Sequence, residues 1–233
     1  MIQKTKPLII YGTGETADIA YQYFTHDSPY EVVAFTMNEA YIRQKIHNGL
    51  PVYPFETIET LFSPEDFEIF VGTSYGKLNR DRIKMYEAVK RKGYRCATCI
   101  SSNAYVWHNV QVGENVLILE QTVLQHKVSI GNNVIIWGGC YIGHQSKIGD
   151  HVFLAPRVAI PGFCEIGTGS FLAVNVTVND FLKIGKDNFI ASGAVVTKDT
   201  PPGVLMKGVP AKADPRSCYE IFNVPKKFAE FIP

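Results

Sequence analysis

The sequence lacks several features that mark particular classes of protein. The apolar run before Gly12 is only a few residues long, too short for a signal peptide or a membrane span. The formal net charge is +1, which gives no charge-driven attraction to nucleic acid or to an anionic membrane. Cysteine is scarce and odd in number, at five residues, which favours reduced thiols. We therefore expect a cytoplasmic protein with no nucleic-acid partner and no membrane span.

What the sequence does contain is an internal repeat. Every sixth residue from Ile100 to Val196 is Ile, Leu or Val, at 17 positions without a gap. Three hexads make 18 residues, which predicts a coil of three short strands with the aliphatic side chains inward and stacked coils about 4.8 Å apart. Glycine recurs every 18 residues, where we expect a corner whose backbone conformation other residues resist. These glycines are Gly113, Gly131, Gly149, Gly167 and Gly185.

The first hundred residues alternate in the βαβ manner. We expect strands over 7–12, 30–37, 67–73 and 95–100, and helices over 15–24 and 77–91. This order predicts a small α/β domain with a parallel sheet. The turn Gly12-Thr13-Gly14, with Ala17 after it, fits the G-x-G-x-x-A phosphate fingerprint.

A small Rossmann-like domain followed by a hexapeptide prism resembles the NeuD/PglD-type sugar acyltransferases of the hexapeptide-repeat family. The residues that end the prism, 193–212, also resemble the end of such domains. The resemblance implies a Rossmann-like substrate domain over 1–99, an all-β left-handed parallel β-helix acyltransferase domain over 100–212, and a tail over 213–233 beyond the match. It also implies a homotrimer with active sites between subunits, because a single prism leaves apolar outer faces.

The implied activity is acetyl transfer from acetyl-CoA to an amino or hydroxyl group of a sugar, nucleotide-linked, in surface polysaccharide synthesis. Residues 141–150 resemble the family's active-site hexad, which makes His144 the expected general base. Gln145 stands where the family has Asp or Glu, and an amide can orient the ring but cannot stabilise imidazolium by charge. Gly162, 18 residues after His144, is expected to direct its backbone N–H at the thioester oxygen.

The resemblance also implies binding residues in both domains. For acetyl-CoA, the positions that match the family's contacts are Phe153, Val174 and Ser192, with Lys198, Lys207 and Lys212 as candidates for its phosphates. For the nucleotide-linked sugar, the expected contacts are Gly12, Thr13, Gly14, Thr36, Met37, Gly72, Asn79 and Arg80.

A column of histidines at intervals of 18 raises the question of a metal. His108, His126 and His144 are expected one coil apart, where neighbouring rings stack flat instead of converging on an ion. We therefore expect no metal site, and we interpret His126 as a candidate substrate contact.

Two other functions stay open. A non-catalytic β-helix binding or scaffold protein is favoured by Gln145. A NAD-type function of the first domain is suggested by the glycine turn, although the strand ending at Met37 is followed by no acid for a ribose hydroxyl.

Overall fold

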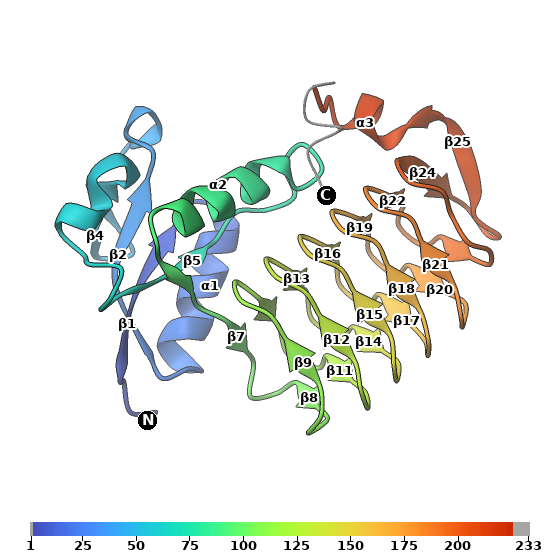
Figure 1. The fold of residues 1–233 in the computed structure, drawn as a ribbon, viewed down its shortest axis with the longest axis horizontal. Helices are drawn as coiled ribbons and strands as arrows, with labels where there is room; N and C mark the ends of the chain where they lie inside the picture. The colour runs from blue at the N-terminus through green and yellow to red at the C-terminus, as the bar shows by residue number, and fades with distance from the viewer. Residues whose placement is uncertain (1, 226–233) are drawn as a thin grey trace.

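The computed structural model describes residues 2–225 and begins with an α/β domain, drawn in blue to green in Figure 1. Its sheet has the strand order β3-β4-β2-β1-β5-β6, and only the β3–β4 pair is antiparallel. The strands are β1 Lys6–Tyr11, β2 Tyr30–Met37, β3 Ile46–His47, β4 Leu50–Pro54, β5 Glu68–Val71 and β6 Arg95–Cys96. The helices are α1 Glu15–His26 and α2 Arg80–Arg91, with 3-10 turns η1 Glu39–Tyr41 and η2 Phe55–Thr60.

The expected strands and helices of this domain are confirmed, with two differences. The β3–β4 hairpin was not predicted, because neither strand has a long apolar pattern. Helix α2 begins at Arg80 instead of Lys77, since Lys77, Leu78 and Asn79 all have left-handed backbone angles that no right-handed helix can contain. Within residues 2–225, no helix is long and apolar enough to cross a membrane.

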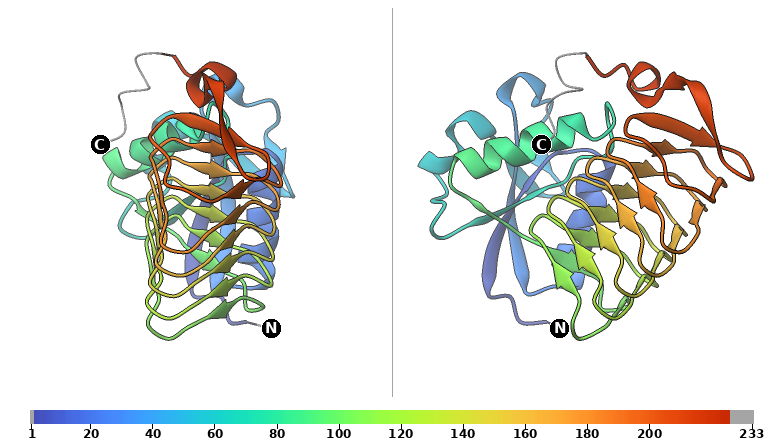
Figure 2. Two further views of the ribbon diagram at one scale, coloured as in Figure 1. Left: turned by 90° about the vertical axis from the view of Figure 1, so that its right-hand side faces the viewer. Right: turned by 45° about the vertical axis from the view of Figure 1, so that its right-hand side comes forward.

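Residues 99–207 form a three-sided prism of stacked coils, in which every strand pairs in parallel with the strands 18 residues away (Figure 2). The covered face is built from β7 Cys99–Ile100, β10 Leu117–Ile118, β13 Ile135–Ile136, β16 Phe153–Leu154, β19 Phe171–Leu172, β22 Phe189–Ile190 and β24 Val204–Lys207. The open face comprises β8 Tyr105–Val106, β11 Val123–Leu124, β14 Tyr141–Ile142, β17 Ala159–Ile160, β20 Thr177–Val178 and β23 Val195–Val196. The polar face consists of β9 Gln111–Val112, β12 Ser129–Ile130, β15 Lys147–Ile148, β18 Glu165–Ile166 and β21 Lys183–Ile184.

The hexad prediction is confirmed at every coil. Each aliphatic residue of the series is the second residue of a strand, and all of them line the single core of the prism. An extended chain turns alternate side chains to opposite sides, so the first residue of each strand faces outward. The three faces therefore differ only in their outward residues.

The predicted reason for the glycine column is wrong. None of these glycines has a positive φ; Gly113, for example, stands in ordinary backbone. A Cβ on Gly113 would lie 2.7 Å from the carbonyl oxygen of Gly131, and one on Gly167 would lie 2.5 Å from the amide nitrogen of Lys186. The column therefore needs glycine because consecutive coils approach too closely for a side chain.

The chain covers one face of its own prism. The β5–α2 loop places Tyr75 against Phe153 and Phe171, with ring centroids 5.1 and 4.5 Å apart. At the far end, β25 Lys212–Ser217 pairs antiparallel with β24, and α3 Cys218–Ile221 follows over the last coils (Figure 1). The last part of the predicted tail, residues 226–233, lies outside the described residues.

Candidate active site

The first turn of the α/β domain forms a pocket at the carboxyl ends of β1, β2 and β5. Gly12 has φ +132°, and a Cβ there would lie 2.8 Å from the carbonyl oxygen of Gly72. A Cβ on Gly72 would in turn lie 2.9 Å from the backbone of Ala17. These contacts let the turn, the β5 end and α1 meet closely and enclose about 370 Å³. The lining includes five predicted residues: Gly12, Thr13, Gly14, Met37 and Gly72.

Three other predicted substrate residues do not reach this pocket. Thr36 is fully buried, and its hydroxyl donates to the carbonyl of Tyr53 at 2.9 Å. Asn79 is also buried and donates to the carbonyl of Gly169 in the prism at 2.9 Å. Arg80 forms a buried ion pair with Asp187 at 2.9 Å. Asn79 and Arg80 therefore join the two domains, and their positions do not support phosphate binding.

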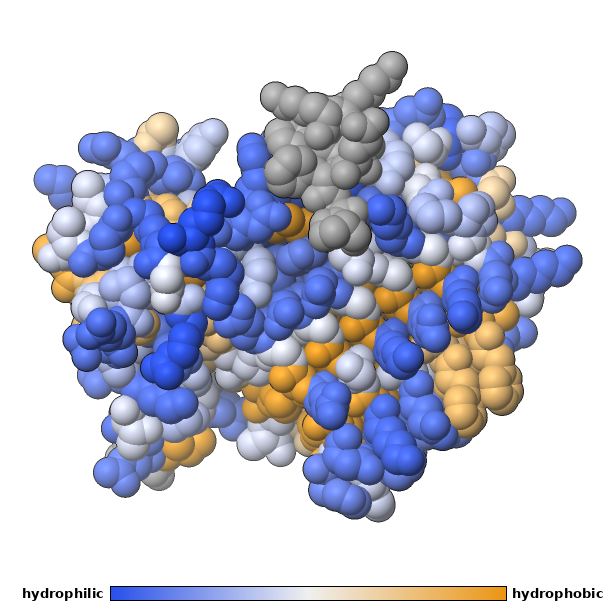
Figure 3. All heavy atoms as spheres, in the orientation of Figure 1, coloured by the Kyte–Doolittle hydropathy of each residue, from blue (hydrophilic) through white to orange (hydrophobic). Residues whose placement is uncertain are grey.

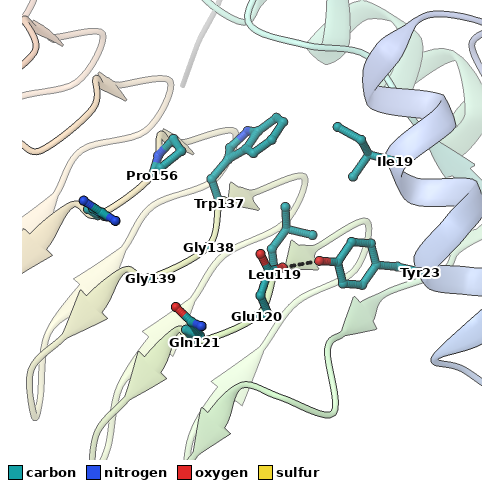
Figure 4. A pocket seen from close by; sticks show the side chains of 10 residues that line it. Ile19, Tyr23, Leu119, Glu120, Gln121, Trp137, Gly138, Gly139 and Pro156 are labelled. Atoms are coloured by element: carbon teal, nitrogen blue, oxygen red, sulfur yellow. Dashed lines mark hydrogen bonds between the residues drawn. The ribbon is translucent and has the colours of Figure 1, made fainter.

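A second pocket of about 420 Å³ lies between α1 and the prism (Figure 4). Tyr23 on α1 donates a hydrogen bond to Glu120 on the prism across this pocket. Burial and the Glu120 carboxylate raise the pKa of Tyr23 to about 12, so the phenol stays protonated. Trp137 lines both pockets, and its indole nitrogen is buried with no hydrogen-bond partner among the described residues.

The second pocket marks one edge of the open face, which we name the Val174 corner. Its column at intervals of 18 consists of Glu120, Gly138, Pro156, Val174 and Ser192. Backbone hydrogen bonds tie these coils together, as from Asn175 N–H to the Pro156 carbonyl and from Gly193 N–H to the Val174 carbonyl. The sequence analysis identified the last two members but missed Glu120 and Trp137. The 18-residue spacing from Val174 leads directly to Glu120.

The other edge of the open face carries His144, and we name it the His144 corner. Its column consists of His126, His144, Gly162, Asp180 and Lys198. The imidazole of His144 is exposed and lies flat over Gly162, where a Cβ would come within 2.7 to 3.2 Å of three ring atoms. Phe163 meets the imidazole edge to face, with centroids 5.0 Å apart. Within residues 2–225, no hydrogen bond to the imidazole is present, from Gln145 or any other residue.

Two neighbours of His144 have contacts that the sequence did not predict. The backbone N–H of Gly162 donates to the Asp180 carboxylate at 3.1 Å, so the expected oxyanion donor already has an acceptor. Gln145 adopts a left-handed backbone, and its N–H donates to the carbonyl of His126 at 2.9 Å. The His126 ring is exposed and lies 3.0 Å from the amide of Asn109.

The predicted acetyl-CoA residues separate into accessible and inaccessible groups. Val174, Ser192 and Lys198 are exposed on the two corners. Lys207 is exposed but forms an ion pair with Asp214. Phe153 is only 2% exposed under Tyr75, because the β5–α2 loop covers it. Phe153 therefore cannot contact a ligand on the surface of this chain.

The open face between the two corners is apolar and uncovered by this chain. Its outward residues include Tyr105, 52% exposed, and Tyr141, 41% exposed. The polar face shows lysine and glutamate instead, as at Lys147 and Glu165. Figure 3 shows apolar side chains in rows that run along the prism between rows of charged ones.

Known proteins share the repeat and the fold. A family model described as bacterial transferase hexapeptide (six repeats) matches residues 109–144 and 127–162. A search of curated protein sequences finds no match. Among solved structures, PerB from Caulobacter crescentus, in complex with CoA and GDP-perosamine, is 26% identical with a TM-score of 0.79, over 89% of this chain and 97% of PerB.

Two further structures show the same fold at lower identity. The acetyltransferase domain of PglB from Neisseria gonorrhoeae, in complex with acetyl coenzyme A, is 22% identical with a TM-score of 0.81 and covers 90% of this chain and 100% of its own. WeeI from Acinetobacter baumannii is 24% identical with a TM-score of 0.75, over the same shares. The chain is a hexapeptide-repeat acyltransferase of the NeuD/PglD type. Its fold is an α/β domain followed by a left-handed parallel β-helix.

In an acyltransferase, the two corners offer complementary chemistry. The His144 corner presents an imidazole, a group that can accept a proton near neutral pH. The Val174 corner presents small residues beside a pocket large enough for a sugar ring. Within one chain the two corners stand at opposite edges of the open face, up to roughly 20 Å apart for six extended residues.

Proposed function

We propose that this protein transfers acetyl from acetyl-CoA to an amino or hydroxyl group of a nucleotide-linked sugar, in surface polysaccharide synthesis. One observation carries the proposal. The imidazole of His144 is presented on an open corner above a glycine, in a fold shared with an enzyme whose structure contains CoA and GDP-perosamine. We expect the cytoplasm as its location, because buried free cysteines suit a reducing compartment.

His144 acts as the general base in this proposal. Acetyl-CoA supplies the activated acetyl group. The imidazole takes the proton from the acceptor nitrogen or oxygen while that atom bonds to the acetyl carbon. When the carbon–sulfur bond breaks, the imidazolium returns the proton to the leaving sulfur. No atom or electron is left over.

Gly162 is the proposed oxyanion donor, and Asp180 is the group that limits it. A carboxylate beside a developing oxyanion is unfavourable because both charges are negative. The Asp180 side chain is exposed and can therefore rotate away from the Gly162 N–H when a thioester oxygen arrives. The proposal requires this release.

A homotrimer would bring the two corners together. A threefold axis parallel to the prism keeps residues of similar number at the same height. His144 of one copy then lies level with Gly138 and Pro156 of the next, which line the α1 pocket. Burial of the open face, including Tyr105 and Tyr141, would drive the assembly.

The same arrangement gives acetyl-CoA a groove between copies. Val174 and Ser192 line one wall and leave room for a thin pantetheine arm, while Lys198 of the next copy stands level with Ser192 for the phosphates. Lys207 is held by Asp214 and contributes charge only if that pair opens. The acceptor would enter through the first-turn pocket at Gly12–Gly14 and Met37, with His126 beside the path.

The test is release of CoA thiol from acetyl-CoA with a panel of free and nucleotide-linked amino sugars. The protein's own cysteines are buried, and burial raises the pKa of Cys140 and Cys218 to about 12, so a thiol reagent reports CoA with little background. His144→Ala should keep the assembly and lose roughly 10³-fold in kcat. His126→Ala, one coil away, is the matched control and should lose only a few-fold. Unchanged turnover in His144→Ala would remove the assignment, and no thiol release with any acceptor would favour a binding or scaffold role.

A further inference from the structure

Two phenylalanines on the His144 corner occupy backbone positions that do not suit them. Phe163 and Phe181 have φ of 59° and 64°, in the left-handed region. Bulky residues rarely adopt this conformation, because their Cβ approaches the neighbouring carbonyl. Among the described residues of the prism, the other left-handed corners carry glycine or a polar residue, as at Asn133 and Asn175. An unfavourable conformation repeated on adjacent coils points to a functional reason.

The two rings form a stack that ends at His144. Phe163 and Phe181 lie 4.9 Å apart and nearly parallel, at 8°. Phe163 then meets the imidazole of His144 at 84°. The phenylalanine rings are exposed to 41% and 70%, so no core packing of this chain explains them.

Phe163 and Phe181 continue the column of Gln145, at intervals of 18 residues. Their backbone N–H groups donate to the carbonyls of His144 and Gly162, at 3.0 and 3.1 Å. The backbone of this column is therefore fixed relative to the histidine column beside it. The related enzymes place an acid at the position of Gln145, whereas this chain places aromatic rings one and two coils beyond it.

We propose that Phe163, supported by Phe181, positions the imidazole of His144 by ring packing, in the place of a hydrogen-bonding carboxylate. Gly162 limits the ring on one side and Phe163 limits it on another, so rotation of the imidazole is restricted without a charge. Phe163 is a positioning residue in this scheme, since it touches the base and not the reacting atoms. The proposal rests on His144 being the general base.

A simpler role for the pair is contact with another copy of the chain. That role and the positioning role predict different results for Phe163→Asn, because asparagine accepts the left-handed backbone readily. If Phe163 positions His144, this variant keeps its oligomeric mass, unfolds at the same temperature or higher, and loses about tenfold in kcat with little change in KM for acetyl-CoA. If Phe163 only joins copies, the variant loses oligomeric mass.

The decisive experiment adds Gln145→Glu to that variant. An acid at position 145 would orient the imidazole by a hydrogen bond and make the ring packing redundant. We expect Gln145→Glu alone to change kcat less than twofold, and the double variant Gln145→Glu/Phe163→Asn to recover most of the loss. Phe163→Tyr, which keeps the ring, should retain near-normal kcat.

Three results would overturn the proposal: normal kcat in Phe163→Asn, loss of kcat together with loss of the oligomer, or no recovery in the double variant. These failures are separate from failure of the proposed function. If His144→Ala is inactive while Phe163→Asn is normal, the base assignment stands and only the positioning role is lost.

Discussion

The covered face and the open face of the prism have the same strand pattern but different neighbours. Both carry apolar outward residues, such as Ile135 on the covered face and Tyr141 on the open face. The α/β domain and the C-terminal segments bury the covered face, whereas nothing in residues 2–225 covers the open face. Both edges of the open face carry the candidate site. The comparison teaches that the surface this chain leaves unburied is the surface on which its chemistry depends.

The strongest test of that comparison is a charge on the open face. Tyr141→Glu would place a carboxylate in the surface proposed to join copies, where burying an unpaired charge is unfavourable. We expect monomers by light scattering and a loss of transfer of about 10³-fold, since one chain cannot bring its two corners together. Lys147→Glu on the polar face is the matched control and should change neither. A fully active monomer of Tyr141→Glu would show that the site is complete within one chain.

Gly162→Ala sharpens the comparison at the His144 edge. The added Cβ would lie 2.7 Å from the imidazole, so the ring must move, and we expect kcat to fall about 10²-fold with little change in thermal midpoint. Gly149→Ala provides the contrast, because its Cβ would lie 2.8 Å from the backbone nitrogen of Thr168. That variant should lower stability instead. Equal loss of stability in both would mean that Gly162 serves coil packing alone.

On the covered face, Arg80→Ala should act on stability. It leaves the carboxylate of Asp187 buried without its guanidinium, a change that typically costs about 3–5 kcal/mol of unfolding free energy. Adding Asp187→Asn removes the buried charge and should recover part of that loss in chemical denaturation. No destabilisation by Arg80→Ala would show that the ion pair does not hold the domains together.

The smallest expected effect is at the Val174 edge. Val174→Trp would fill the groove proposed for acetyl-CoA, and we expect KM for acetyl-CoA to rise about tenfold while kcat changes little. Glu165→Trp on the polar face is the control and should leave KM unchanged. An unaltered KM in Val174→Trp would place the acetyl-CoA groove elsewhere.

Much of the fold followed from periodicity because the repeat is local. The hexad spacing located each prism strand, and βαβ alternation located the main elements of the first domain. The spacing also placed His144 next to Gly162, one coil apart. It gave the wrong reason for the glycine column, because the close approach of successive coils is a distance in space that no local pattern records.

The predictions that failed concern contacts across long stretches of chain. Phe153 was assigned to acetyl-CoA, but a loop more than seventy residues earlier in the sequence covers it. Arg80 was assigned to phosphate, but it pairs with Asp187 in a late coil of the prism. A charged or aromatic residue reads the same in sequence whether it faces a ligand or another domain.

The sequence by itself determined the prism, since an inward aliphatic at every sixth residue can be buried only by winding the chain into three-sided coils. It also determined that His144 faces outward, because that residue falls outside the buried positions of the repeat. Only the tertiary structure decided which face is covered and which groups surround the imidazole. The physical reason is that outward residues gain their free energy from whatever packs on them, and that partner lies far away in the chain or in another molecule.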